Sequence, residues 1–192
     1  MHRTPSAVAL AAALATALPA AAAGLDGSEV TITGYCCLLP SEPFRFTVPA
    51  SATVGAGIEF PAGSLSALGG YDLINSDVDV SAFTIDLVYR ESGEAAGGGF
   101  NGFGFDFAGL AGQRIAGVAL NPASSFATDE VGLSFDADSV FYDGSGLGFE
   151  PGTRVSIDVA LAPVPEPAPA LSLAAGLALL GAWRRRTAFT RS

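Results

Sequence analysis

An alternation of apolar and polar residues with a period of two sets the strictest limit on the fold of this chain. Successive side chains of a β-strand point to opposite faces, so such an alternation predicts strands with one buried face. It occurs in five short segments, whose apolar sets are Val30 and Ile32; Phe44, Phe46 and Val48; Phe83, Ile85, Leu87 and Tyr89; Phe103, Phe105 and Phe107; and Val155, Ile157, Val159 and Leu161.

Glycine and proline separate these segments, and no window within residues 24–162 shows a long helical period. Asp143-Gly144 is the strongest candidate for a tight hairpin turn. Many short strands between turn residues predict an all-β fold, a single antiparallel β-sandwich over residues 24–162. The alternating phenylalanines are expected to form its core.

The N-terminal residues have the pattern of a secretory signal peptide. His2 and Arg3 precede an apolar stretch over residues 7–18, Pro19 ends it, and small residues follow from Ala21 to Ala23. A short positive region, a short apolar run and small residues are typical of a signal peptidase substrate. We therefore expect a signal peptide over residues 1–23, cut between Ala23 and Gly24. An uncleaved anchor or an ordinary alanine-rich helix is the alternative.

The C-terminal residues predict a short membrane-spanning helix. Residues 168–183 carry no charge, and Arg184, Arg185 and Arg186 follow Trp183 directly. As a helix this run is roughly 24 Å long, slightly less than the ~30 Å hydrocarbon core. Cationic flanks stay cytoplasmic, so the C-terminus is expected inside and the domain outside. A buried core helix is the alternative.

The residues before this run are Val164, Pro165, Glu166 and Pro167. This motif, the short apolar run and the arginine cluster, in this order, resemble the PEP-CTERM sorting signal over residues 163–186. The resemblance implies export across the inner membrane of a Gram-negative bacterium that makes extracellular polysaccharide. It also implies recognition and cleavage by an exosortase, a membrane-embedded cysteine transpeptidase-like enzyme. It carries no implication for residues 24–162.

The charge of the predicted domain restricts its partners. Eighteen of the nineteen acidic residues lie in residues 24–162, with only Arg45, Arg90, Arg114 and Arg154 as cations, which gives a net charge of −14. Such a surface repels nucleic acid phosphates and anionic lipids. No nucleic acid partner is therefore expected.

The residue types that are missing restrict the chemistry. The one histidine, His2, belongs to the predicted signal peptide, and the chain has no lysine. The domain thus lacks a histidine base, a histidine-oriented nucleophile, a histidine zinc site and a Schiff-base lysine. The one tryptophan, Trp183, lies in the tail, so tyrosines are the remaining aromatic platforms for sugars. We predict no catalytic residue, metal ligand or cofactor.

Two groups of carboxylates are weaker candidates. Asp136 and Asp138 are expected on one strand face, where a pair could serve glycoside hydrolysis, although a solvated face beside a turn is the simpler interpretation. Asn75, Asp77 and Asp79 have the spacing that begins a calcium loop. The glycine and the closing glutamate of an EF-hand are missing, which favours turn capping by these side chains.

The two cysteines, Cys36 and Cys37, are adjacent. Neighbouring cysteines form a disulfide only with a distorted peptide, so free or mixed states are expected. A vicinal or an intermolecular disulfide is the alternative, since the exported compartment permits disulfides.

These observations favour a non-enzymatic protein of the cell surface or extracellular matrix, sorted by the PEP-CTERM route and associated with exopolysaccharide. Its expected partners are signal peptidase, an exosortase and, transiently, the inner membrane. The alternatives are a secreted carbohydrate-active enzyme that uses two aspartates, and a carbohydrate- or calcium-binding module. Carboxylates clustered in a cleft would favour the enzyme, and exposed tyrosines in a row would favour the module.

The signal peptide leads to a direct prediction. The exported protein should begin at Gly24, because the small residues up to Ala23 fit signal peptidase. N-terminal sequencing of the exported form measures this. A sequence that begins at Met1 would contradict the cleavage.

Overall fold

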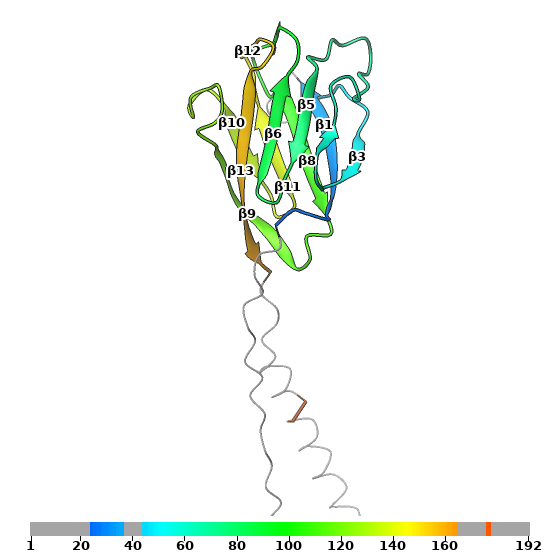
Figure 1. The fold of residues 1–192 in the computed structure, drawn as a ribbon, viewed down its shortest axis with the longest axis vertical. Helices are drawn as coiled ribbons and strands as arrows, with labels where there is room; N and C mark the ends of the chain where they lie inside the picture. Colours follow the sequence, from blue (N-terminus) through cyan, green and yellow to red (C-terminus); the bar gives the residue numbers. More distant parts are fainter. Residues whose placement is uncertain (1–23, 37–43, 165–175, 178–192) are drawn as a thin grey trace, which may run out of the picture.

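The computed structural model describes residues 24–36, 44–164 and 176–177 (Figure 1). Within 24–36 and 44–164 the chain forms strands and no helix. The strands are β1 (Glu29–Cys36), β2 (Phe44–Arg45), β3 (Ala50–Thr53), β4 (Ile58–Phe60), β5 (Ser76–Val80), β6 (Thr84–Tyr89), β7 (Gly93–Glu94), β8 (Gly102–Ala108), β9 (Gln113–Leu120), β10 (Gly132–Phe135), β11 (Ser139–Asp143), β12 (Gly148–Phe149) and β13 (Arg154–Pro163).

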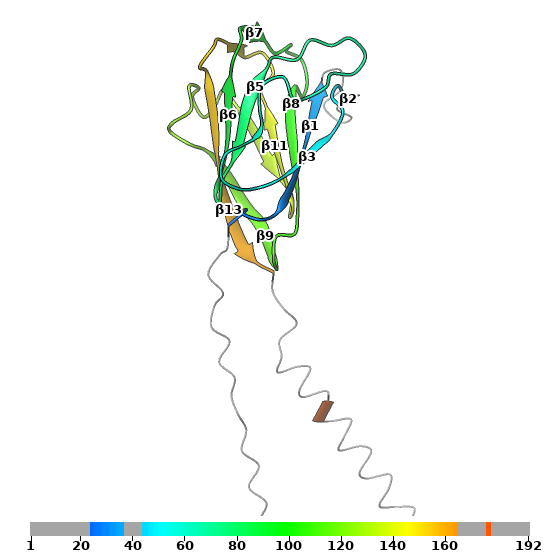
Figure 2. The same ribbon diagram turned by 45° about the vertical axis from the view of Figure 1, so that its right-hand side comes forward.

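Two antiparallel sheets face each other in a sandwich-like arrangement (Figures 1 and 2). The first sheet has the order β10-β11-β8-β1-β2, with β3 also paired to β1, and the second has the order β4-β5-β6-β13-β9. Strands β7 and β12 form a separate antiparallel pair. The all-β, antiparallel prediction is confirmed.

The core lies between the inward faces of the two sheets, as the period-two pattern predicted. From the first sheet, Phe103, Phe105 and Phe107 of β8 are buried. From the second sheet, the apolar residues of β5, β6 and β13 are buried; they are Val78, Val80, Ile85, Leu87, Val155, Ile157 and Val159. The alternation therefore identified about half of the buried apolar residues, and it missed Val78 and Val80 of β5.

Three apolar residues of the predicted strands are not in the core. Phe44 is 54% exposed, Phe83 is 46% exposed, and Val48 is also exposed. Strand β2 pairs only with the last two residues of β1, and beyond it Thr47 forms an isolated bridge with a different segment. Phe83 precedes β6, in the turn that follows β5. Phe44 lies in a two-residue strand at the edge of the first sheet, where both residues are exposed. Val48 and Phe83 lie outside the strands, so the alternation does not bury them.

The predicted hairpin at Asp143-Gly144 is also wrong. Strand β11 ends at Asp143, and the next strand, β12, pairs with β7 instead of β11. The Oδ1 atom of Asp143 accepts hydrogen bonds from the backbone N–H groups of Ser145 and Asn101, each at 3.0 Å. These contacts direct the chain toward the segment that precedes β8.

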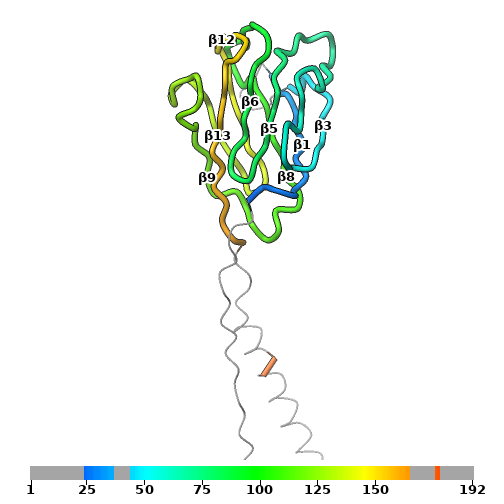
Figure 3. The backbone as a smooth tube through the Cα atoms, viewed as in Figure 1, coloured from blue at the N-terminus to red at the C-terminus, as the bar shows by residue number. Residues whose placement is uncertain are grey.

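The sandwich has two ends with different roles. We define the proximal end by the pairing of Glu29 with Ala108, and the distal end by the pairing of Tyr35 with Gly102. Val164, directly after β13, donates its backbone N–H to Gly112, in the turn that follows β8 at the proximal end. The blue start of the described chain and the end of β13 lie at the bottom of the domain in Figure 3. The pair of β7 (labelled in Figure 2) and β12 (labelled in Figure 1) lies at the distal end.

Several predicted features lie outside the described residues. These are the signal peptide (1–23), Pro165, Glu166, Pro167 and the arginine cluster. Of the predicted span 168–183, only Gly176 and Leu177 are described, and both are helical. Among the described residues, no helix is long and apolar enough to cross a membrane.

Phe105 gives a test of the core. Phe105→Ala should lower the free energy of unfolding by about 3–5 kcal/mol, because it leaves a cavity between the sheets. As a control, Phe135→Ala on β10 should cost less than about 1 kcal/mol, because Phe135 is exposed. Denaturant unfolding of both variants measures the difference. Equal costs would contradict the assignment of Phe105 to the core.

Candidate functional site

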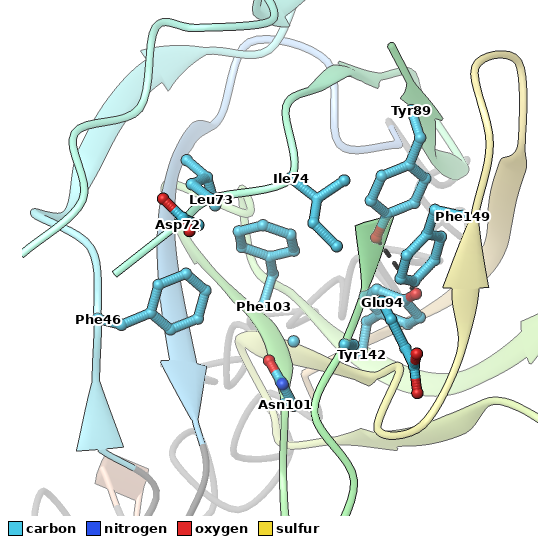
Figure 4. A pocket seen from close by; sticks show the side chains of 12 residues that line it. Phe46, Asp72, Leu73, Ile74, Tyr89, Glu94, Asn101, Phe103, Tyr142 and Phe149 are labelled. Carbon is cyan, nitrogen blue, oxygen red and sulfur yellow. Dashed lines mark hydrogen bonds between the residues drawn. The ribbon is translucent and has the colours of Figure 1, made fainter. Parts of the chain in front are cut away.

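Two adjoining cavities open at the distal end of the sandwich. Figure 4 shows the residues that line the inner one. We call them together the distal cleft. The inner cavity, of about 80 Å³, is lined by Phe46, Asp72, Leu73, Ile74, Tyr89, Glu94, Ala95, Asn101, Gly102, Phe103, Tyr142 and Phe149. The outer cavity, of about 210 Å³, is lined by Cys36, Phe46, Tyr71, Asp72, Glu94, Ala96 and Asn101. Four shared residues make the two cavities one continuous site.

The floor of the cleft is a pair of tyrosines, one from each sheet. Tyr89 ends β6 and Tyr142 lies in β11, and they are only 3% and 1% exposed. Their hydroxyl oxygens lie 3.3 Å apart and share one hydrogen bond (Figure 4). Two hydroxyls carry two hydrogens, and one bond uses only one of them. Within the described residues, the other O–H therefore has no acceptor.

Both hydroxyls are neutral at physiological pH, since the ordinary pKa of a tyrosine lies near 10 and burial raises it further. Burial raises the pKa of Tyr142 to about 12 and the pKa of Tyr89 well above its ordinary value. Phe149 contributes to this burial, since its ring stacks on Tyr89 with centroids 3.9 Å apart. The floor therefore offers a neutral hydrogen-bond donor at physiological pH, and no phenolate that could act as a base.

Aromatic rings form one wall of the cleft. The ring centroid of Phe46 lies 6.4 Å from that of Phe103 and 6.3 Å from that of Tyr71. Phe46 reaches this position because it packs over Gly34 of β1, where an added Cβ would lie 2.9 Å from the Phe46 ring. A side chain at Gly34 would displace the ring from the wall.

Asp72 and Glu94 carry the negative charge of the cleft. Both line the inner and the outer cavity, and both are exposed. Neither carboxylate accepts a hydrogen bond or forms an ion pair with any described residue. The charges are therefore available to a ligand.

None of the four arginines of residues 24–162 lines the cleft. Arg90 pairs with Asp77, and Arg154 pairs with Asp86 at 2.8 Å. Of the other two, Arg45 lies in β2, where it pairs with Tyr35 of β1, and Arg114 lies in β9 near the proximal end. The two carboxylates of the cleft thus have no neutralising cation among its lining residues.

Asp136 and Asp138 do not form the predicted pair on a strand. They lie in the turn between β10 and β11, both exposed, at the proximal end. The strand prediction is wrong because β10 ends at Phe135, where the chain turns so that β11 can pair with β10. They are remote from the distal cleft.

The spacing of Asn75, Asp77 and Asp79 does not form a loop. Asp77 and Asp79 belong to β5, on the outer face of the second sheet. Asp77 accepts hydrogen bonds from the backbone N–H of Ala62 at 2.7 Å and from Nε of Arg90 at 2.6 Å. It therefore caps a neighbouring turn from within a strand. Among the described residues, no three His, Cys, Asp or Glu side chains are grouped so as to hold a metal ion.

Cys36, on the rim of the outer cavity, is disulfide-bonded. This corrects the expectation of a free or mixed state for this residue, since the geometric cost on which that expectation rested does not by itself decide whether a cysteine is oxidised. The other cysteine, Cys37, lies outside the described residues.

The sequence did not indicate the cleft. Asp72 follows Gly69-Gly70 in one loop, and Glu94 lies in a strand of two residues that only the pairing with β12 creates. The tyrosines do not form an exposed row, because Tyr89 and Tyr142 are buried and Tyr71 is on the rim. The local signals were thus a short polar loop and buried aromatic positions, which are common in β proteins with no binding site.

Comparisons with known proteins identify no relative of this chain. No known protein family, no curated protein and no solved structure matches it. The chemistry of the distal cleft is therefore argued from its own residues.

Asp79, on the outer face of the second sheet, gives a test of how the neighbouring acidic residues affect stability. Burial, then Glu59 and Asp86, raise the pKa of Asp79, while Arg154 opposes them. Asp79→Asn should therefore raise the free energy of unfolding at pH 7, by less than about 1 kcal/mol. A raised pKa means that the charged form costs stability, so this gain should shrink as the pH falls through that pKa. Urea unfolding at several pH values measures it.

Asp77→Asn is the matched control. The Ala62 N–H and then Arg90 lower the pKa of Asp77, so its charged form stabilises the fold. This variant should be less stable than wild type at neutral pH, and the difference should disappear as the pH falls through the lowered pKa. If both variants changed the free energy of unfolding at pH 7 in the same direction, the lowered pKa of Asp77 and the raised pKa of Asp79 would be contradicted.

Proposed function

We propose that this chain is an exported, non-enzymatic protein of the cell surface or extracellular matrix, sorted by a PEP-CTERM/exosortase system and associated with exopolysaccharide. The proposal includes a single sandwich domain between a cleaved signal peptide and a short membrane-spanning helix. One observation carries it: the motif at residues 164–167, the uncharged run 168–183 and the cluster Arg184–Arg186 follow one another in this order.

The position of the last strand supports this proposal. Strand β13 ends at Pro163, and the backbone N–H of Val164 donates to the carbonyl of Gly112 at 2.8 Å. The motif thus begins directly after the folded body. Prolines on both sides of Glu166 exclude it from a helix and favour an extended backbone, which a processing enzyme could reach.

The location of the cleft supports a role in binding outside the cell. Val164 lies at the proximal end, and the distal cleft lies at the opposite end of the sandwich. A protein attached through its C-terminal tail would present this cleft away from the membrane. Aromatic walls with a few polar groups are typical of ligand sites, and a matrix polysaccharide would meet this end first.

A secreted carbohydrate-active enzyme is the second candidate, because Asp72 and Glu94 border one cleft. Glycoside hydrolysis needs two carboxyl groups, one of them kept protonated by its surroundings. Both side chains are exposed, which favours binding over hydrolysis. Release of reducing ends from exopolysaccharide by wild type, lost in Glu94→Gln, would instead support the enzyme.

The sorting proposal predicts the fate of the tail. Glu166→Ala should leave signal-peptide removal intact but accumulate an inner-membrane form that keeps Trp183 and the arginines, because an exosortase would no longer read the motif. Replacing Arg184, Arg185 and Arg186 together should instead disturb retention and orientation. The C-terminal peptide mass in membrane and extracellular fractions measures both effects.

Asp136→Ala is the control for the loss of one acidic side chain, since Asp136 is exposed and lies outside the motif. It should be processed like wild type. Extracellular wild-type protein that still ends at Ser192 would contradict the sorting proposal.

A further inference from the structure

We propose that the proximal tip of the sandwich rests on the surface of the lipid bilayer. We define the proximal tip as residues 108–114, from the end of β8 to the start of β9, and residues 160–164 at the end of β13. The inference rests on the proposed function, because it needs the proposed membrane-spanning helix. It adds a contact between the folded domain and the lipid headgroups, which a tail that acts only as a tether does not require.

The two segments of the proximal tip form one continuous surface. Gln113 pairs with Pro163, and the backbone N–H of Val164 donates to the carbonyl of Gly112 at 2.8 Å. The N–H of Gln113 donates to the carbonyl of Leu110 at 2.9 Å, which closes the turn between β8 and β9. Figure 2 shows β9 and the end of β13 together at the bottom of the domain. The chain therefore leaves the sandwich from within the tip.

The connection from the tip to the predicted span is short. Only residues 165–167 separate Val164 from the uncharged run that begins at Ala168. An extended chain covers at most about 3.6 Å per residue, so the four steps from Val164 to Ala168 bridge roughly 14 Å. About 5–8 Å of this distance lies in the headgroup layer outside the hydrocarbon core. A span that starts at Ala168 thus leaves less than about 9 Å between the tip and the headgroups.

The charge of the tip differs from that of the rest of the domain. Residues 24–162 have a net charge of −14, but the tip contains no acidic residue, and its one charged residue is Arg114. Arg114 is exposed and forms no ion pair with any described residue. An exposed cation is attracted to the anionic lipids of a bilayer surface, whereas the acidic sides of the domain are repelled. The tip is therefore the part of the domain that complements such a surface.

Acidic residues begin directly above the tip, and they oppose a tilt of the domain. Glu29 pairs with Ala108, and the carbonyl of Asp138 accepts from the backbone N–H of Phe107 at 2.8 Å. At about 3.3 Å per residue, the turn extends up to roughly 10 Å beyond this level. That distance is similar to the Debye length of about 8 Å at physiological ionic strength, so salt weakens the repulsion when only the tip touches the surface. A tilted domain would bring the acids closer and lose this advantage.

The side chains of the tip indicate contact with the headgroups and not insertion into the hydrocarbon core. Ala108 and Ala111 are exposed, and both are small. Leu110 is the one larger apolar residue of the turn, and it packs against the core of the domain instead of pointing fully into solvent. Val164 is 46% exposed at the point where the tail leaves. A small, nearly uncharged surface of this kind lets the backbone approach the headgroups without a steric or electrostatic penalty.

Quenching of tryptophan fluorescence by lipids with a nitroxide on the headgroup tests the proposal. The protein is purified with its tail from a host that has signal peptidase and no exosortase, and is reconstituted into vesicles of phosphatidylcholine and phosphatidylglycerol. The only tryptophan of the chain, Trp183, reports whether the tail is inserted. In a Trp183→Phe background, Ala111→Trp reports on the tip. Ala96→Trp, at an exposed position beside the distal cleft, is the matched control.

We expect the Ala111→Trp protein to lose most of its fluorescence in the labelled vesicles and the Ala96→Trp protein to keep it. Ala111 has a positive φ of 50°, so Ala108→Trp, also exposed in the tip, is a second probe that avoids this backbone position. The melting temperature of each variant shows whether the domain is folded.

Reversal of one charge tests the electrostatic part of the argument. In the Ala111→Trp protein, Arg114→Glu should weaken the quenching, because the tip would then carry an acid that the anionic lipids repel. Arg45→Glu makes the same change of charge near the distal end, where Arg45 pairs with Tyr35, and should leave the quenching unchanged.

Quenching of Trp183 without quenching at positions 111 and 108 would overturn the proposal. The tip would then stand clear of the lipid or need a membrane protein as its partner, while the proposed span and the sorting signal would remain. Equal quenching at positions 111 and 96 would also overturn it, since the domain would have no preferred orientation. Absence of quenching at Trp183 itself would overturn the proposed span, and this proposal with it.

Discussion

The inward faces of the two sheets are buried against each other, and every other feature of the domain follows from this contact. Strand β8 faces the second sheet with Phe103, Phe105 and Phe107, and all three are buried. The contact removes a large apolar area from water, which is the main favourable term in folding. The strands that supply it also fix where the two ends of the sandwich lie, and therefore where the chain enters and leaves the domain and where the distal cleft opens.

At the distal end the same closure leaves a polar site. Tyr89 and Tyr142 come from opposite sheets, and their hydroxyls meet where apolar side chains would otherwise fill the space. Both groups are protonated at physiological pH, and burial raises each pKa further, so the end of the core becomes a neutral hydrogen-bonding floor. The short pair of β7 and β12 then brings Glu94 to the rim. The cleft is thus a consequence of how the sandwich is closed at this end.

The arrangement of charge follows from the scarcity of cations. Two of the four arginines of residues 24–162 neutralise carboxylates on the outer face of the second sheet, through Asp77 and Asp86. Asp79, directly opposite Asp86, receives no such partner, and its pKa is raised. At the distal end, Asp72 and Glu94 likewise have no cationic neighbour lining the cleft. The location of the few arginines therefore determines which acids remain available to a ligand.

The class of fold and about half of the core could be predicted from the amino-acid order alone, because a period-two pattern is a local property of a strand. The same pattern misplaced Phe44, which lies in a short edge strand, and Phe83, which lies before β6. Asp143-Gly144 was mistaken for a hairpin, because the whole fold decides which strands pair. The targeting signals that we propose for the two ends are likewise predicted from the sequence, because charge order and apolar length define such signals without a fold. The distal cleft is different: Asp72, Glu94 and the two buried tyrosines come together only in the folded domain. Their segments are separated in the chain, and no local spacing encodes a contact that forms only when both sheets close.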